Sequence, residues 1–365
     1  MPKNLIIFMP SIEGGGVEKN LFIISNYLAK YIKNISLITL SKSYKKKFDK
    51  KIKFLTLNNS MWDKIGRRKK FIVSLFILFF EIIKARGNIL VLCFQGNIYC
   101  TLLCKLLGIK IIVRSNSAPD GWSQNIIKFY FFKYIFKLAD KILVNSYDFK
   151  KKFKTKFGIN AECIYNPLNI KEIIKKSKKK TKYKFPKTKL KIINIGRFTD
   201  QKDQITLLKA LNLIKNKINF FLYIVGRGIE KKNLENFVKK EGLINKVKII
   251  NFQKNPFSIL KKSNLFILSS IYEGLPNVLL EAIVLKKYVI SSNCPTGPRE
   301  ILLNGKGGSL YDPKDYISLA RIIYDYSKNT KKYQSKTNYA HKNLYRFDYN
   351  LNLTKYLNTV RSLIY

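Results

Sequence analysis

The chain has very little histidine and no closely paired cysteines. Its one histidine, His341, lies in a polar segment rich in lysine and asparagine, so we do not expect a catalytic triad centred on histidine. The five cysteines include no Cys-x-x-Cys pair, which is typical of small buried hydrophobic residues in a reducing compartment. We therefore expect no zinc or iron site, and no cofactor.

Long apolar runs are also missing. No stretch approaches the roughly 18–20 apolar residues that are needed to span a bilayer. The N-terminal run from Leu5 to Met9 is too short for a signal peptide, and Pro10 and three glycines follow it, which predicts a first strand and a phosphate loop. We therefore expect the protein to be cytoplasmic or to lie on a membrane surface.

Negative charge is scarce, because 70 lysines and arginines stand against 22 aspartates and glutamates, a formal charge of +48. An excess of this size favours an anionic polymer or anionic lipid as a partner. Part of the excess has a simpler explanation, since lysine, isoleucine and asparagine are all abundant in proteins from AT-rich genomes. A nucleic-acid-binding protein is the alternative from another class, but the chain has no RNA-binding signature, and its aromatic residues fall in apolar helices.

Apolar strands alternate with helical segments along the whole chain, which is typical of parallel, doubly wound α/β sheets. The first series of predicted strands comprises Leu5–Met9, Ile35–Leu40, Ile52–Leu57, Ile89–Phe94, Lys110–Arg114, Lys141–Asn145 and Cys163–Tyr165. The second series comprises Lys191–Ile195, Phe220–Val225, Val247–Asn251, Leu265–Ser269 and Tyr288–Ser292. We predict an N-terminal domain over residues 1–170, a basic linker over 171–189 and a second domain over 190–345.

The most informative segment runs from Ser269 to Ala282, after a buried strand. Gly274 allows a ligand to approach the backbone, and Leu275 and Pro276 lead into a predicted helix whose first amides, at Asn277 and Val278, would attract phosphate. Glu281 lies one turn further on, and its side chain leans back toward this helix start, while Glu273 lies on the loop before it. Carboxylates for sugar hydroxyls and amides for phosphate together suit a nucleotide-sugar.

Glu273, seven intervening residues and Glu281 resemble the paired-glutamate motif of glycosyltransferase family 4, and the surrounding Glu-Gly-Leu-Pro-Asn-Val-Leu-Leu-Glu-Ala makes the match more specific. The resemblance implies retaining enzymes of the GT-B fold, in which two doubly wound, Rossmann-like domains face a cleft. It also implies that residues 346–365 form a C-terminal helix that returns to the N-terminal domain. In this family Glu273 would hold the donor sugar, and Glu281 the ribose.

Two further motifs follow strands of the second domain. Gly196-Arg197, with Gln201-Lys202 four residues on, stands at the carboxyl end of a strand, where Arg197 and Lys202 can each neutralise a diphosphate oxygen. The alternative is a surface arginine and lysine in a lysine-rich protein. The resemblance implies that these two cations bind the donor diphosphate, and it places Gly226 near the nucleotide base.

The N-terminal domain offers a glycine-rich loop, in which Gly14, Gly15 and Gly16 allow close backbone approach to a phosphate or sugar. A plain turn is the alternative. The resemblance places Gly15 and Gly16 against the donor and Gly14 against the donor or acceptor. It also makes Arg114 and Asn116, at a strand end, candidates for sugar or acceptor contact, because many family members carry in that loop a histidine that faces the donor sugar, and this chain has none there. An ordinary strand end is the alternative.

The resemblance implies an enzyme that moves a hexose or N-acetylhexosamine from a UDP-linked donor to a membrane-presented glycan or glycolipid, as in bacterial surface polysaccharide or lipid-linked oligosaccharide synthesis. Cys294 to Ile301 resembles enzymes that transfer N-acetylhexosamines. With Glu273, Arg197 and Lys202 in catalytic roles, no metal would be required. A phosphorylase or sugar epimerase of the same fold is the alternative chemistry.

Two apolar stretches bear on a peripheral position at the inner face of the cell membrane. Residues 71–80 are apolar all round and lie between basic clusters, a pattern that favours a helix buried in a core. Residues 126–137 mix aromatic residues with lysines, which suits either core packing or contact with an anionic membrane surface.

Overall fold

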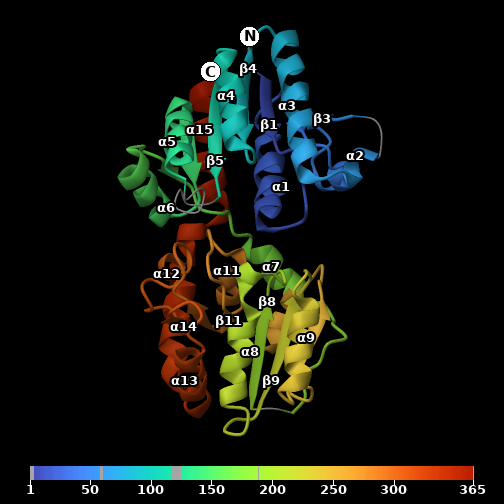
Figure 1. Ribbon diagram of the computed structural model, residues 1–365. Helices are drawn as coiled ribbons and strands as arrows, with labels where there is room; N and C mark the ends of the chain where they lie inside the picture. Colours follow the sequence, from blue (N-terminus) through green and yellow to red (C-terminus); the bar gives the residue numbers. More distant parts are fainter. Residues whose placement is uncertain (1–3, 58–60, 117–124, 188, 365) are drawn as a thin grey trace. The chain divides into compact units, whose positions relative to one another are not determined.

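The computed structural model describes residues 4–57, 61–116, 125–187 and 189–364, and it divides into two compact units (Figure 1). The N-terminal unit comprises Met1–Pro167 together with Tyr349–Tyr365, and the C-terminal unit comprises Leu168–Asp348. Each unit is built on its own parallel sheet with helices on both faces. The predicted α/β class with two doubly wound sheets is therefore confirmed.

The N-terminal sheet has the order β3-β2-β1-β4-β5-β6-β7, and every pairing is parallel. Its strands are β1 (Asn4–Phe8), β2 (Ile35–Ile38), β3 (Lys53–Leu55), β4 (Ile89–Cys93), β5 (Lys110–Ser115), β6 (Lys141–Val144) and β7 (Glu162–Cys163). Its helices are α1 (Gly16–Leu28), α2 (Met61–Lys64), α3 (Arg67–Lys84), α4 (Asn97–Leu106), α5 (Ile126–Leu138), α6 (Tyr147–Lys152) and α15 (Tyr349–Ile364), with short helical turns at Lys42–Lys47 and Phe153–Phe157.

Successive side chains along a strand point to opposite faces of this sheet. Leu5 and Ile7 point to the face that α1 and α15 cover, whereas Ile6 and Phe8 point to the face that α3, α4, α5 and α6 cover. Each face is apolar because a central parallel strand is buried on both sides. The C-terminal helix α15 thus completes the core of the unit that begins the chain.

The C-terminal sheet has the order β10-β9-β8-β11-β12-β13, again entirely parallel. Its strands are β8 (Leu190–Ile195), β9 (Phe220–Gly226), β10 (Val247–Asn251), β11 (Leu265–Leu268), β12 (Tyr288–Ser292) and β13 (Ser309–Tyr311). Its helices are α7 (Ile170–Ser177), α8 (Gln204–Leu213), α9 (Lys231–Lys240), α10 (Phe257–Lys262), α11 (Asn277–Val284), α12 (Pro298–Ile301), α13 (Tyr316–Lys328) and α14 (Gln334–Lys342), with turns at Asp200–Lys202, Thr330–Tyr333 and Asn343–Phe347. Helices α8, α9 and α13 pack on one face.

Two segments differ from the sequence-based expectation. The predicted linker over 171–189 contains helix α7, which packs against α10 and α11 and belongs to the C-terminal unit. Asn255 Nδ2 donates to the Lys176 carbonyl at 2.9 Å, which fixes the end of this helix. Of the ten lysines in residues 171–189, three lie on α7, where Ile173 is buried, and seven follow the helix.

Helix α3 also differs from the expectation. The prediction that residues 71–80 form a helix buried in a core is wrong for the outer side of α3, which is exposed. Ser74, Leu78 and Ile82 are buried, but Ile72, Phe76 and Phe80 are more than half exposed. The helix covers only one face of the sheet, so its apolar outer side has no covering layer within the described residues. None of the described helices combines the length and the apolarity that crossing a bilayer requires.

Candidate active site

The predicted diphosphate and glutamate motifs meet in the C-terminal unit, at the point where its strand order reverses. Strand β8 lies between β9 and β11, so the loops that follow β8 and β11 leave the sheet side by side and lead to helices on opposite faces. Ligands of open α/β sheets bind outside the carboxyl ends of strands at such a position. The loop after β8 carries Arg197 and Lys202, and the loop after β11 carries Glu273.

Lys202 and Glu273 form an ion pair, in which the Lys202 ammonium donates to Glu273 Oε1. The side chains are only 15% and 7% exposed, so the pair is largely shielded from water. Ser270 Oγ donates to the same carboxylate oxygen at 2.6 Å. One carboxylate oxygen therefore receives a cation and a hydroxyl, which fixes the side chain at the base of the site.

Main-chain contacts hold the loop that carries Glu273. Thr296 Oγ1 donates to the Glu273 carbonyl at 2.7 Å, and Ser292 Oγ donates to the Ser270 carbonyl at 2.6 Å. These hydroxyls come from strand β12 and the loop after it. Sequence reasoning missed Ser270, Ser292 and Thr296, although the hydroxyl residues at the ends of β11 and β12 were the signal that could have shown them.

The loop after β8 is tied to the same place. Ser269 Oγ donates to the Lys202 carbonyl at 2.8 Å, and the Ile271 amide donates to the Gln201 carbonyl at 2.8 Å. Gln201 Nε2 donates to the Tyr272 carbonyl at 2.9 Å, and its Oε1 accepts from the exposed Arg197 guanidinium at 3.3 Å. Arg197 is thus positioned beside the pair but open to solvent, where a second anion can reach it.

Two glycines in this region cannot be replaced without backbone movement. A Cβ on Gly226, at the end of β9, would lie 1.8 Å from the Gly196 carbonyl oxygen. A Cβ on Gly297 would lie 1.8 Å from the Gly274 carbonyl oxygen, and Gly297 has a φ of +77° that L-residues rarely adopt. Gly196, Gly226 and Gly274 were predicted to lie near a ligand, and the structure also gives each a role in the close packing of the loops.

Helix α11 begins at Asn277, directly after Pro276. Leu275 and Pro276 are buried, whereas Asn277 and Val278 are partly exposed at the helix start. Glu281 lies on the second turn and is 5% exposed, so its carboxylate is enclosed rather than solvated. The helix start thus has a buried carboxylate on its second turn, and Glu273 comes four residues before Asn277 on the preceding loop.

Cys294 lies next to the site and is chemically quiet. Burial, reinforced by the nearby Glu273 carboxylate, raises the pKa of the Cys294 thiol to about 12. The side chain is 2% exposed. A thiol that stays protonated at neutral pH is a poor nucleophile, so Cys294 serves as a small packing residue.

The glycine-rich loop of the N-terminal unit closes strand β1 and opens helix α1. Gly14 has a φ of +86°, Gly15 is the residue before the helix, and Gly16 is its first residue. Glu18 Oε1 accepts from the Glu13 amide at 3.4 Å, and a Cβ on Gly15 would lie 2.9 Å from Glu18 Oε2. The loop follows β1 at the strand-order reversal of its own sheet, and its three glycines are exposed.

Arg114 and Asn116, the candidates for sugar or acceptor contact, are held by hydrogen bonds within the N-terminal unit. Arg114 is fully buried, and its guanidinium donates to Tyr356 Oη at 2.8 Å, to Asn166 Oδ1 at 2.8 Å and to Asn116 Oδ1. Asn116 Nδ2 donates to the Phe94 carbonyl at 3.3 Å. These bonds hold both side chains in place, and α15 supplies one partner of Arg114, Tyr356, from the far end of the chain.

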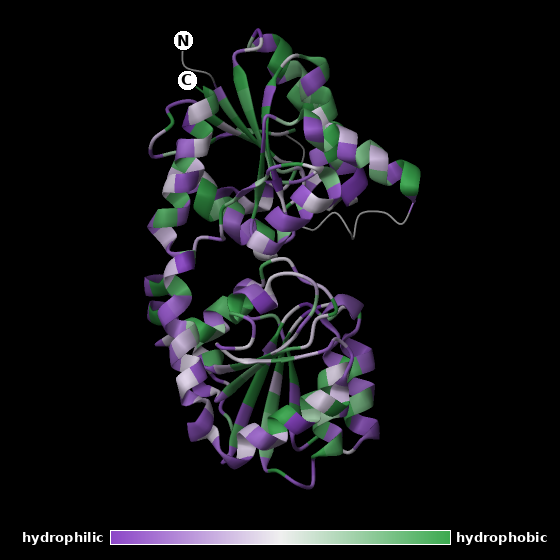
Figure 2. Ribbon diagram, turned by 90° about the vertical axis from the view of Figure 1, so that its left-hand side faces the viewer, coloured by the Kyte–Doolittle hydropathy of each residue, from purple (hydrophilic) through white to green (hydrophobic). Residues whose placement is uncertain are grey.

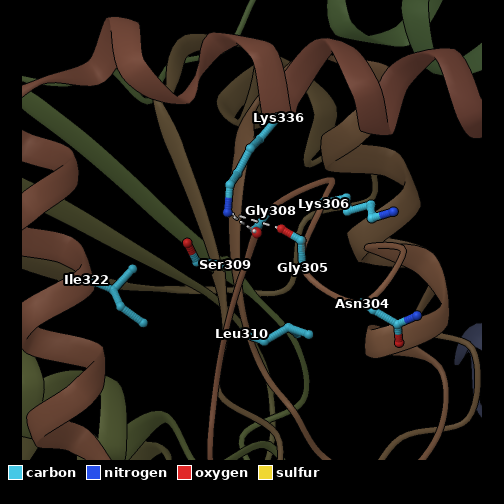
Figure 3. Close-up of a pocket in the computed structure, with 8 residues that line it drawn as sticks. All are labelled: Asn304, Gly305, Lys306, Gly308, Ser309, Leu310, Ile322 and Lys336. Carbon is cyan, nitrogen blue, oxygen red and sulfur yellow. Dashed lines mark hydrogen bonds between the residues drawn. The ribbon is translucent and has the colours of Figure 1, made fainter.

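A cavity of about 530 Å³ lies elsewhere in the C-terminal unit, around the turn before β13. Its lining includes Lys306 and Lys336, and none of the predicted site residues. Figure 3 shows the Lys336 side chain directed at the main chain, where its ammonium donates to the Gly305 carbonyl at 3.1 Å and the Gly308 carbonyl at 3.5 Å. This lysine therefore braces a turn, and the cavity has no carboxylate that could act on a sugar.

Comparison with known families identifies the part of the chain that holds this site. Residues 175–343 match the family model described as Glycosyl transferases group 1. This range includes helix α11 and the two loops that follow β8 and β11. The C-terminal unit is a glycosyltransferase group 1 domain. The cations and carboxylates described above are therefore those of a group 1 domain.

The relatives of this group 1 domain include glycosyltransferases of archaea and bacteria. The glycosyltransferase MJ1059 of Methanocaldococcus jannaschii is 39% identical over 204 residues, which cover 52% of this chain and 49% of that protein. An N-acetylgalactosaminyltransferase of Campylobacter jejuni, whose name specifies a diphospho-undecaprenol substrate, is 24% identical over 253 residues, 65% of this chain and 67% of that protein. The chain thus aligns with about half to two thirds of these curated relatives.

Solved structures extend the likeness to the whole chain. HepE of Anabaena, solved in complex with UDP, superposes with a TM-score of 0.76 at 18% identity and covers 99% of this chain and 100% of its own. Sucrose-phosphate synthase of Thermosynechococcus elongatus has a TM-score of 0.79 at 16% identity, with 99% of each chain covered. At these identities the comparison establishes the fold, which is GT-B.

Proposed function

We propose that this protein is a retaining glycosyltransferase of family 4, which moves a hexose or N-acetylhexosamine from a UDP-linked donor to a membrane-presented glycan or glycolipid. The observation that carries the proposal is the shielded Lys202–Glu273 pair beside the start of α11, at the strand-order reversal of a group 1 domain. Support for the donor comes from HepE, which was solved with UDP and with UDP-glucose. Support for the acceptor comes from the Campylobacter relative, whose name specifies a diphospho-undecaprenol substrate.

The diphosphate of the donor leaves with developing negative charge, and this site offers three sources of positive potential. Arg197 is exposed to an incoming phosphate, and Lys202 keeps three N–H donors, only one of which Glu273 Oε1 needs. The amino end of α11 adds the partial positive charge of a helix start. These groups stabilise the leaving diphosphate electrostatically without a metal ion.

The carboxylates of Glu273 and Glu281 recognise two other parts of the donor, the sugar and the ribose. Glu273, which Ser270 and Lys202 hold, presents its other oxygen to hydroxyls of the donor sugar. Glu281, which is enclosed on the second turn of α11, accepts from the ribose hydroxyls. Cys294 stays protonated, so its thiol is a poor nucleophile. We assign retention to a front-face displacement assisted by the departing phosphate, which needs no nucleophile from the protein.

The test is turnover with a panel of UDP- and GDP-sugars and a lipid-linked glycan acceptor, in buffer that contains EDTA. We expect release of UDP from one donor and a product whose anomeric configuration, read by NMR, equals that of the donor. An inverted product would refute the retaining assignment, release of GDP alone would refute the UDP donor, and activity restored only by added manganese would refute the metal-independent mechanism.

A further inference from the structure

Three neighbouring helices of the N-terminal unit leave large apolar side chains exposed. Five such side chains are on α3, two on α4 and five on α5. Phe76 and Phe80 of α3 are 61% and 66% exposed, and Ile127 of α5 is 77% exposed. A helix that covers a sheet normally turns a polar side to water, so an apolar outer surface of this size indicates an interaction site.

The exposed residues belong to one layer. Helix α4 contacts both α3 and α5, and the inner sides of all three pack on the same face of the sheet (Figure 1). Figure 2 shows hydrophobic colour on the helices of the N-terminal unit as well as on the strands of both sheets. We call the outer side of this layer the α3–α5 face.

The composition of the whole chain does not account for the α3–α5 face. Helices α1 and α15 cover the opposite face of the same sheet, and of their large hydrophobic residues only Leu351 is exposed. In the C-terminal unit such residues occur singly, as with Leu213 on α8 and Ile244 after α9. Genomic bias acts on every helix, so a concentration on three neighbours indicates a surface with its own function.

Charge around the α3–α5 face is almost entirely positive. Arg67, Arg68 and Lys69 are exposed at the start of α3, and Lys84 is exposed at its end. On α5, Lys128 and Lys137 are exposed. Glu81 is the only acidic residue in the three helices. Rings and aliphatic groups with basic residues at their margins match the interface of an anionic bilayer, where rings lie at headgroup depth and cations meet lipid phosphates.

We propose that the α3–α5 face docks peripherally on an anionic lipid bilayer, with Phe76, Phe80 and Ile127 inserted and the basic residues against headgroups. The proposal rests on the proposed function in one respect, since docking would bring the enzyme beside a membrane-presented acceptor. Binding to lipid itself needs neither donor nor turnover. A failure of docking can therefore be distinguished from a failure of the catalytic assignment.

The experiment measures co-sedimentation with vesicles of phosphatidylcholine alone and of phosphatidylcholine with phosphatidylglycerol. We expect binding to the anionic vesicles only, and incomplete release at high salt because the apolar insertion is not screened. The double variant Phe76→Ser/Phe80→Ser should lower the partition coefficient at least about tenfold, and Lys128→Glu/Lys137→Glu should lower it by a similar factor.

Matched controls come from the C-terminal unit. Leu213→Ser/Ile244→Ser removes apolar groups that are also more than half exposed, and Lys232→Glu/Lys239→Glu on α9 makes the same change of net charge as Lys128→Glu/Lys137→Glu. We expect both controls to bind vesicles like the wild type, with UDP affinity unchanged in all four variants. Equal loss in the controls, equal binding to both vesicle types, or a dimer that the phenylalanine substitutions dissociate would overturn the proposal, the last by showing that a second copy covers this face.

Discussion

Replacing Glu273 by glutamine tests the central ion pair with little change of shape. The substitution removes the charge that Lys202 contacts and leaves an ammonium that is 15% exposed without its partner. Breaking a fully buried pair costs about 3–5 kcal/mol, whereas an exposed pair contributes about 0–1 kcal/mol. The residual exposure of this pair places the expected loss in the free energy of unfolding at about 1–3 kcal/mol.

The double variant Lys202→Met/Glu273→Gln separates the pair from its surroundings. Because neither charge remains, the double variant should be more stable than the sum of the two single losses predicts, by about 1–2 kcal/mol. Urea midpoints at an unchanged m-value give these free energies. Ser263→Ala is the control for a loss of stability away from the pair, because it removes a buried hydroxyl that donates to the Leu260 carbonyl at 2.8 Å. This variant should leave UDP affinity unchanged.

Turnover gives the second readout of the same variants. Glu273→Gln should lower kcat by about 10²–10³, in the range of losing one electrostatic contact in the transition state. Single losses that add to the double loss within about 0.5 kcal/mol would show that the two residues do not act on each other, and would refute the reasoning.

Three other expectations follow from the same unit. Glu281→Ala should weaken UDP binding by about 1–3 kcal/mol in calorimetry with the fold intact, and unchanged affinity would contradict the ribose assignment. Arg197→Ala should cut turnover by about 10²–10³ while activity persists in EDTA, and a loss that manganese restores would contradict the role of the cation. Burial, and the charge of Lys261, lower the pKa of Lys287 to about 8 in the folded protein. The unfolded chain therefore binds the Lys287 proton more tightly, and the free energy of unfolding should rise with pH between about 8 and 10.5. Urea midpoints of Lys287→Met across that range should rise less than those of the wild type, and parallel profiles would exclude the effect.

Most strands of both sheets were predictable from apolar runs alone, because central parallel strands are buried on both faces. Strand β13 was missed, since the three residues Ser309–Tyr311 are too short to show a pattern. Helix α3 was assigned to the core because a helix that is apolar all round gives no sign of which side is covered. That information lies in the number of layers around the sheet rather than in the helix itself.

The candidate site was predictable where strand order and local motif agree. Lys202 and Glu273 are 71 positions apart, yet each follows a strand beside the reversal, so their meeting follows from topology. Arg114 also stands at a strand end, but its environment depends on Tyr356, 242 positions later. No local pattern could reveal that burial. The supporting hydroxyl of Ser270 was missed because serine next to a strand end has many ordinary roles.

The position of α15 has a consequence for the order of events during synthesis. This helix contributes three wholly buried residues, Leu353, Tyr356 and Val360, to the core of the N-terminal unit. The buried Arg114 guanidinium also donates to the Tyr356 hydroxyl. The ribosome makes residues 168–348 between the two parts of this core. At about 5–20 residues per second this interval lasts roughly 10–40 s. The N-terminal unit therefore cannot complete its core until α15 has been made, and until then the apolar residues that α15 covers lack that helix.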